Sequence, residues 1–398
     1  MLENILNKNM TLLVASILFA VGLVEGALHL FIKPSEVSYG TVFGRELPPY
    51  KLIPDHVKAS DFNIGGQDDV LGYVVKNNQT SKDGWVQTNN VAARYRSDVS
   101  PEIPVGKKRI LAFGDSYTFG YALPQDETWP YLLEEKLDRL QILNFGVSGY
   151  SIGQSYLRFQ RVTEQVDYNA VILVFVPKAD LWRDINVSRY IGMGWEAYML
   201  MPRFIIEDGK LRLVERPYKT LSEVIKHSEE NSDHVLREFL RKYDRFYFPG
   251  KFEVTSYLNH SILFKLMLTA YYERKAKMLR ESLYDPLSEA MQISKMIFRE
   301  MHQKVRGSGK EFVLVVLGQR GTMRKYRRSP EFQEKWDRMV KAVCDSDYLC
   351  IDTMPELVQA SPEDLDRAYD GSHFGPEGNQ AIAEILWNRI GTIASEGN

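Results

Sequence analysis

The chain has 398 residues, 44% hydrophobic and 26% charged, a composition typical of a globular protein with one large domain or a domain plus a smaller module. Its 50 basic and 52 acidic residues leave a formal net charge of −2, which gives no indication of nucleic-acid binding. The two cysteines, Cys344 and Cys350, belong to no CxxC pair or Cys/His cluster, which argues against a structural zinc site. Nothing in the sequence implies a metal or an organic cofactor.

An apolar segment over residues 10–32 is the first clear feature, interrupted by a single acid, Glu25, near its outer end. A membrane-spanning helix needs about 20 mainly apolar residues, so the segment is long enough to be a transmembrane anchor. Lys8 in the short tail 1–9 favours a cytoplasmic amino end, which would place the rest of the chain on the extracytoplasmic, periplasmic side. The alternative is a signal peptide cleaved near the small residues Ala20 and Gly22.

Export would make a disulfide chemically feasible. Cys344 and Cys350 lie six positions apart, at the end of an expected helix and inside an expected strand. They could pair, or remain as two buried free thiols.

Residues 33–69 contain four prolines without a sustained period, and we interpret them as a linker. Short β segments are expected over 70–97. From residue 107 onward, apolar runs alternate with helical spacing. We predict strands at 109–113, 141–145, 170–176, 311–317 and 348–352, and helices at 129–140, 153–165, 287–306, 330–343 and 376–394.

This alternation predicts an α/β three-layer sandwich over 70–398, with a parallel sheet covered by helices on both faces. A stretch at about 183–285, rich in aromatic and charged residues, interrupts the pattern and is read as an insertion. In parallel sheets, ligands bind at the carboxyl ends of the strands. The motifs around residues 116, 149 and 180 all follow expected strands.

Ser116 follows the first of these strands directly, in the stretch 114–120 (Gly-Asp-Ser-Tyr-Thr-Phe-Gly). A serine hydroxyl is a poor nucleophile unless a base removes its proton, and that base is usually histidine oriented by an acid. Asp370 and His373 share one short loop before the last helix, and no other histidine has this setting. We predict Ser116 as nucleophile, His373 as base and Asp370 as orienting acid. The rival interpretation is that Ser116 begins a helix and Asp370 shapes a turn.

Three sequence blocks occur in order: Gly114-Asp115-Ser116, Asn144 to Gly149, and Asp370-x-x-His373. Together they resemble the GDSL or SGNH hydrolases. The resemblance implies a flavodoxin-like sheet and a serine esterase mechanism. It also implies an oxyanion hole made by the backbone amides of Ser116 and Gly149.

The surrounding sequence is similar to a membrane-anchored bacterial branch associated with cell-surface polysaccharides. Leu71-Gly72-Tyr73 and the Asn/Arg segment 89–96 carry that similarity. It implies an acylated carbohydrate, or another ester, as substrate. The alternatives are an O-acyltransferase acting on a surface polysaccharide, or a non-catalytic glycan-binding or assembly protein.

One position departs from the family pattern. Ala179 stands where the family carries an asparagine that donates to the oxyanion. Loss of one such donor typically costs about 10²–10³ in rate. Lys178, Arg183 or Asn186 could replace it.

Four further residues are expected to line the site: Asp115, Lys178, Asp180 and Trp182. Asp180 is read as mainly structural, because the triad already has its acid. The basic cluster between Arg320 and Arg328 is interpreted as a solvated surface loop, with an anion-binding role as the alternative.

Overall fold

A computed structural model describes residues 2–52, 64–190, 200–229, 233–253, 257–344, 347–359 and 373–395. Its centre is a parallel sheet with the strand order β6-β5-β7-β10-β11. In chain order this is 2-1-3-4-5, the flavodoxin-like doubly wound arrangement, with its switch point between the first and third strands. The strands are β5 (Lys108–Phe113), β6 (Leu140–Asn144), β7 (Ala170–Phe175), β10 (Glu311–Val316) and β11 (Leu349–Asp352).

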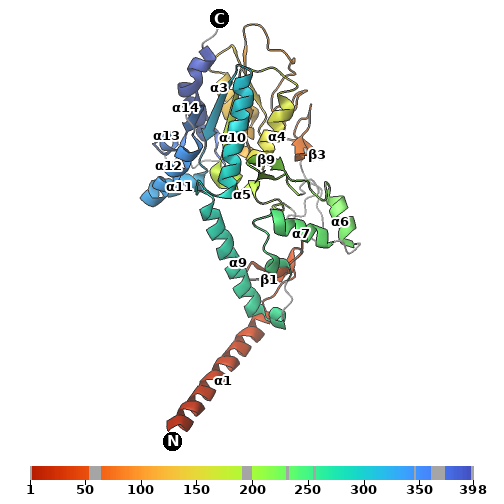
Figure 1. The fold of residues 1–398 in the computed structure, drawn as a ribbon, viewed down its shortest axis with the longest axis vertical. Coiled ribbons are helices and arrows are strands. Elements are labelled where there is room, and N and C mark those ends of the chain that lie inside the picture. Colours follow the sequence, from red (N-terminus) through yellow and green to blue (C-terminus); the bar gives the residue numbers. More distant parts are fainter. Residues whose placement is uncertain are drawn as a thin grey trace.

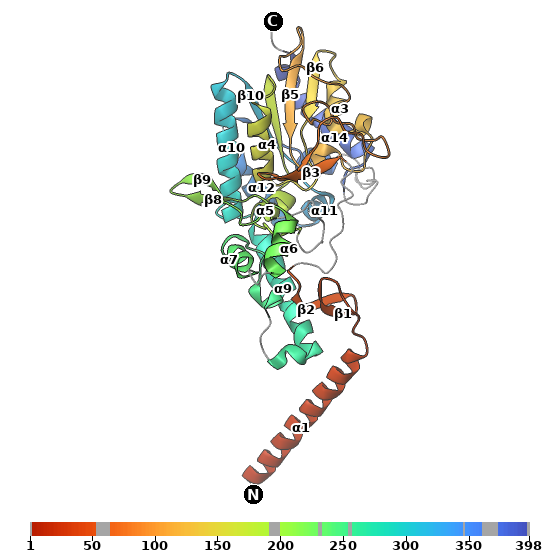
Figure 2. The ribbon, with the colours of Figure 1, turned by 90° about the vertical axis from the view of Figure 1, so that its right-hand side faces the viewer.

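Helices cover both faces of this sheet, which confirms the predicted α/β three-layer sandwich. On one face α3 (Trp129–Glu134) packs against α14 (Pro376–Ser395), and on the other α4 (Ile152–Val162) packs against α10 (Glu289–Gly307) (Figure 2). All six residues of β7 are buried, because the strand lies in the middle of the sheet with helices above and below.

Shorter elements follow the carboxyl ends of the strands or connect them. They are α2 (Ser116–Phe119), η1 (Gln125–Glu127), α5 (Pro177–Asp184), α11 (Arg320–Arg328), α12 (Pro330–Val343) and α13 (Met354–Gln359). The cysteines are joined as a disulfide, Cys344–Cys350, between the end of α12 and β11.

The stretch 183–285 departs from the β–α alternation. Its described part holds a hairpin, several short helices and one long helix that leads away from the sheet (Figure 1). Its described elements are β8 (Phe204–Glu207), β9 (Lys210–Leu213), α6 (Leu221–Glu229), α7 (Asp233–Tyr243), α8 (Pro249–Phe252), η3 (Tyr257–His260) and α9 (Ile262–Ser282).

The amino-terminal helix α1 (Leu2–His29) projects from the molecule (Figure 1). Its segment Asn9–His29 has a mean hydropathy of 2.1 with none of its most apolar stretch buried, so it is long and apolar enough to span a membrane.

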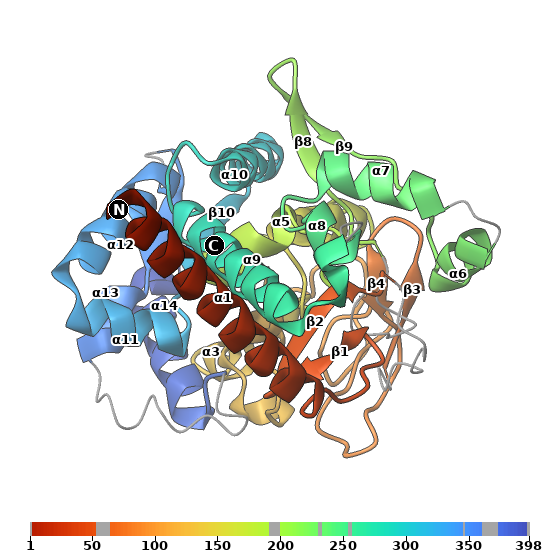
Figure 3. The same ribbon diagram turned by 90° about the horizontal axis from the view of Figure 1, so that it is seen from below.

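The segment 33–69, interpreted from sequence as a linker, contains regular structure. It forms a hairpin of β1 (Ser38–Val42) and β2 (Arg45–Tyr50), and its last residues enter β3 (Gly65–Asp68), which pairs with β4 (Gly72–Val75). The hairpin packs on α9, a partner that no local pattern indicates (Figure 3). We refer to α1, the β1–β2 hairpin and α9 as the arm, and to the parallel sheet with its covering helices as the body.

Candidate active site

Ser116 is presented by the turn that ends β5. Asp115 caps α2, its carboxylate accepting from the backbone N–H of Tyr117 at 2.9 Å. Ser116 is the first residue of that short helix and is 4% exposed. The turn therefore aims its side chain outward at the carboxyl edge of the sheet, where doubly wound folds bind ligands.

His373 meets this serine from the opposite end of the chain. Its Nε2 lies 2.8 Å from Ser116 Oγ, a hydrogen bond across 257 positions of sequence. The ring centres of Tyr117 and Tyr121 lie 4.8 and 5.0 Å from the centre of the imidazole ring. These two contacts restrict the rotation of the imidazole. With the imidazole neutral and its proton on Nδ1, Nε2 can accept the serine proton. The predicted acid, Asp370, lies outside the described residues.

Two tyrosines fix the turn at Gly149, after β6. Tyr73 donates to the carbonyl of Ser148 at 2.6 Å, and Tyr190 donates to the carbonyl of Gly149 at 3.1 Å. Gly149 has φ +81°, and a Cβ there would lie 2.3 Å from the Tyr190 hydroxyl. Only glycine fits this turn without strain. Neither tyrosine was predicted as a site residue, because their partners are backbone carbonyls of a distant segment.

A buried ion pair lies next to Ser116 and is formed by Asp115 and Arg183. Arg183 Nη1 donates to Asp115 Oδ2 at 2.7 Å and to the Tyr150 carbonyl at 2.9 Å, and lies 3.7 Å from Asp180 Oδ1. Burial lowers the pKa of Arg183, but the facing Asp115 and other acidic groups outweigh it and hold that pKa above its ordinary value. Burial and the charge of Asp115 raise the pKa of Asp180 well above its usual range.

The remaining expected residues lie on α5. Asp180 accepts from the backbone N–H of Val176 at 2.6 Å, which stabilises the first turn of the helix. Ala179 is buried, and its methyl group offers no hydrogen-bond donor. Lys178 and Arg183 both reach the cavity that contains Ser116, whereas Asn186, the third suggested substitute, is not among its described lining residues.

The cavity at Ser116 has a volume of about 270 Å³. Its described lining residues are Ser116, Tyr117, Lys178, Arg183, Gln319, Arg320, Gly321, Arg324 and His373. The cluster 320–328, interpreted as a surface loop, is the helix α11, and two of its arginines, Arg320 and Arg324, line the cavity that contains Ser116. That interpretation missed the helix because α11 carries almost no apolar residues to show a period.

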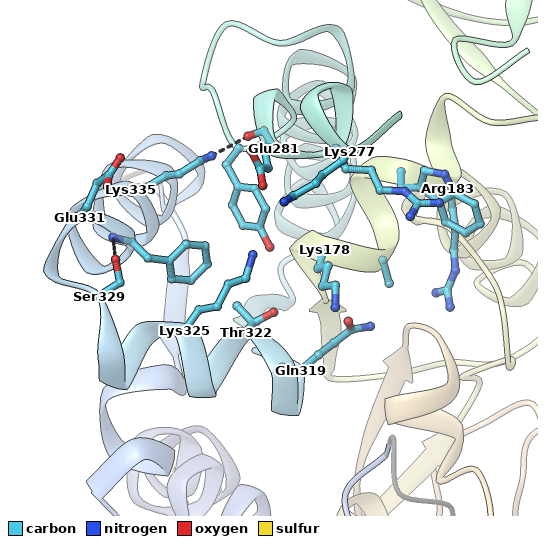
Figure 4. A pocket seen from close by; sticks show the side chains of 16 residues that line it. Lys178, Arg183, Lys277, Glu281, Gln319, Thr322, Lys325, Ser329, Glu331 and Lys335 are labelled. Carbon is cyan, nitrogen blue, oxygen red and sulfur yellow. Dashed lines mark hydrogen bonds between the residues drawn. The ribbon is translucent and has the colours of Figure 1, made fainter. Parts of the chain in front are cut away.

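A larger cavity of about 750 Å³ adjoins the first and shares Lys178, Arg183, Gln319 and Gly321 with it (Figure 4). Trp182 lines this larger cavity, as do Ala179 and Lys325, the latter from the basic cluster for which anion binding was the alternative interpretation. The other lining residues were not predicted: Lys277, Arg280, Glu281, Tyr284, Thr322, Ser329, Glu331, Phe332 and Lys335. Within the described ranges, no group of three or more His, Cys, Asp or Glu residues is arranged to hold a metal ion.

No protein-family model and no curated protein sequence matches the chain. Solved structures are similar to it in fold. An acetylxylan esterase from Geobacillus stearothermophilus is 12% identical, with a TM-score of 0.37 over 71% of this chain and 94% of that one. A member of the lipolytic G-D-S-L family from Veillonella parvula is 9% identical, with a TM-score of 0.34 over 71% and 97%. At these values the similarities carry no argument about activity, which must come from the site.

Proposed function

We propose that this protein is a serine esterase of the SGNH type that forms an acyl-enzyme on Ser116. The 2.8 Å contact between Ser116 Oγ and His373 Nε2 is the observation that carries the proposal. That distance lies within the range in which a base can take the proton of an attacking hydroxyl.

In the proposed mechanism, Ser116 Oγ attacks the ester carbonyl carbon while His373 Nε2 takes the hydroxyl proton. The oxyanion is held by the backbone amides of Ser116 and Gly149, and His373 then returns the proton to the leaving alcohol. Water, activated by His373, releases the acyl group from Ser116. Asp370 would orient the imidazole. Ala179 provides no donor here, so we assign the side-chain contribution to the oxyanion to Lys178 or Arg183, which line the same cavity.

We further propose that α1 anchors the enzyme in a membrane with the body on the extracytoplasmic side. The length and apolar surface of α1 and the Cys344–Cys350 disulfide support this location, because disulfides persist in oxidising compartments. The expected substrate is an O-acyl ester on a carbohydrate.

Acyl transfer to a sugar hydroxyl is the second proposed function. The 750 Å³ cavity beside the nucleophile supports it, since an acceptor bound there would meet the acyl-enzyme before bulk water does.

The test is hydrolysis of p-nitrophenyl acetate, butyrate and octanoate by the full chain in a non-ionic detergent. Ser116→Ala should abolish turnover and labelling by a fluorophosphonate probe, whereas Ser308→Ala, at an exposed helix end, should retain both. Adding a polysaccharide acceptor would distinguish transfer from hydrolysis by the appearance of acylated glycan. Absence of turnover, transfer and labelling in the unmodified chain would contradict the enzyme proposal and favour a binding or assembly role.

A further inference from the structure

The larger cavity is strongly cationic. Six basic residues and two acidic residues line it: Lys178, Arg183, Lys277, Arg280, Lys325 and Lys335 against Glu281 and Glu331. The basic residues come from three separate parts of the fold, α5, α9 and the α11–α12 pair, so the excess of positive charge arises only when these elements meet.

Three of these cations already have defined partners. Arg183 is paired with Asp115. Arg280 lies over the rings of Trp182 and Phe246, at 5.3 and 5.8 Å from their centres. Lys335 donates to the backbone carbonyl of Glu281 at 2.6 Å.

The other three are lysines for which the described residues supply no acidic partner, although Lys325 Nζ lies 5.8 Å from the centre of the Phe332 ring. In the described part of the chain, no ion pair joins Lys178, Lys277 or Lys325 to a carboxylate. Figure 4 shows the ammonium groups of Lys277 and Lys325 pointing toward each other across the cavity, whereas that of Lys178 points toward Gln319. Burial, followed by the charges of Lys325 and Arg280, lowers the pKa of Lys178. Like charges around one cavity repel one another, and an anion bound among them would relieve that repulsion.

We propose that the larger cavity binds a phosphate or carboxylate group of the ester substrate, with Lys178, Lys277 and Lys325 as its ligands. Lys178, which also lines the Ser116 cavity, links the two sites, so one molecule can place its ester at Ser116 and its anionic group between the lysines. The aromatic side chains of Trp182, Tyr284 and Phe332 supply apolar wall for the uncharged part of that molecule.

This inference deepens the proposed function, on which it rests, by naming the substrate class as an anionic ester. Two sources share that chemistry: a sugar phosphate or uronate, and the phosphate of a lipid headgroup. The position of α9 agrees with either source, because its amino end contacts α1 and its carboxyl end supplies Lys277 and Arg280 to the cavity (Figure 1).

Binding can be measured without turnover, by calorimetry on the full-length Ser116→Ala chain in a non-ionic detergent. We expect glucose 1-phosphate and glucuronate to bind and neutral glucose not to bind. In that background, Lys277→Gln with Lys325→Gln should weaken anion binding about ten-fold or more, because two charged ligands are lost. The matched control is Lys210→Gln with Lys341→Gln, which removes two exposed lysines elsewhere and should leave binding unchanged. Equal binding of glucose and the anions, or unchanged affinity in the cavity double variant, would overturn the proposal.

A further measurement compares the binding of glucose 1-phosphate with that of short-chain phosphatidic acid below its micellar concentration. Binding of either one that requires Lys277 and Lys325 supports the site, and the tighter ligand identifies the source. Anion binding without any Ser116-dependent turnover would refute only the esterase, whereas turnover without anion binding would refute only this inference.

Discussion

The body and the arm are held together by different interactions. In the body, β7 is buried along its whole length and the surrounding side chains are almost all apolar. In the arm, the buried residues of α9 are Ile262, Lys265 and Thr269, two of which are polar. Apolar packing needs no particular partner atom, whereas each buried polar group needs a placed hydrogen-bond partner.

The polar contacts of the arm show those partners. Lys265 Nζ donates to the Pro48 carbonyl at 2.9 Å and lies 3.5 Å from the centre of the Tyr39 ring. Thr269 donates to the Glu46 carbonyl at 3.1 Å. The Glu25 carboxylate of α1 accepts from Ser261 at 2.8 Å and from the first amides of α9. The arm therefore combines these hydrogen bonds with a small apolar cluster of Leu28, Val42, Leu47 and Ile262, whereas the body depends on a large apolar core, and variants can separate the two.

The largest expected effect is on catalysis in the body. His373→Gln removes the base but fills similar space, so kcat/KM for p-nitrophenyl acetate should fall about 10⁴-fold with little change in thermal unfolding. His260→Gln, at the exposed end of η3, should leave kcat/KM unchanged. If both variants kept full activity, His373 would not be the base.

The next effect is on the stability of the body. Gly149→Ala places a methyl group against the Tyr190 and Tyr73 hydroxyls at a φ of +81°, and should lower the free energy of unfolding by about 3 kcal/mol. Gly309→Ala is the matched control, because Gly309 has φ +70° with nothing within 4 Å, and should cost about 1 kcal/mol. Chemical denaturation measures the free energy of unfolding of both variants. Equal decreases would mean that the Tyr73 and Tyr190 side chains move aside without cost.

A smaller expected effect is a pH dependence of the stability of the body, caused by Asp352 at the end of the edge strand β11. Burial, with help from the charges of Asp337 and Glu356, raises the pKa of Asp352 from 3.8 to about 6, although Trp336 and the Met354 amide donate to its carboxylate. As pH rises from about 4 to 6, the unfolded chain releases this proton first, so the native state loses stability over that window.

Asp352→Asn removes this titration and keeps an acceptor for Trp336. Between pH 4 and pH 7, the free energy of unfolding of this variant should therefore rise relative to that of the unmodified chain by on the order of 2 kcal/mol. Parallel curves for Asp352→Asn and the unmodified chain would place its native pKa near the ordinary value.

The smallest effect concerns the arm. Glu25→Gln weakens the cap on α9 by about 1 kcal/mol, because a neutral amide accepts these hydrogen bonds less strongly than a carboxylate. Hydrogen exchange of the amides near residues 262–265 should accelerate about five-fold, while exchange in β7 stays constant. Glu36→Gln, an exposed acid between α1 and β1, is the control. Equal acceleration in β7 would show that arm and body unfold as one unit.

Prediction from sequence succeeded where local patterns were strong. The five strands and the helix over 330–343 lie within one or two residues of their predicted bounds, because apolar runs and helical spacing are written into consecutive residues. The pairing of Ser116 with His373 was also predicted, since each lies in a short motif next to a strand or helix end. The roles of Gly149 and Asp370 in catalysis stay predictions.

The β1–β2 hairpin, the helix α11 and the cationic cavity could not be predicted in the same way. The hairpin is stabilised by contacts to α9, more than 200 positions away, and α11 has too few apolar residues to show a period. The cavity requires α5, α9, α11 and α12 to meet, and nothing in any one of these segments indicates the other three.

The sequence by itself determined the parallel sheet, the apolar amino-terminal helix and the placement of Ser116 and His373 next to a strand end and a helix start, because these depend on short-range patterns of residue type. Only the tertiary structure decided the cysteine pairing, the hydrogen bonds that build the arm and the gathering of three lysines around the cavity that adjoins Ser116. Hydrogen bonding and electrostatics act over a few ångströms in space, so residues far apart in the chain form a site only once folding has placed them together.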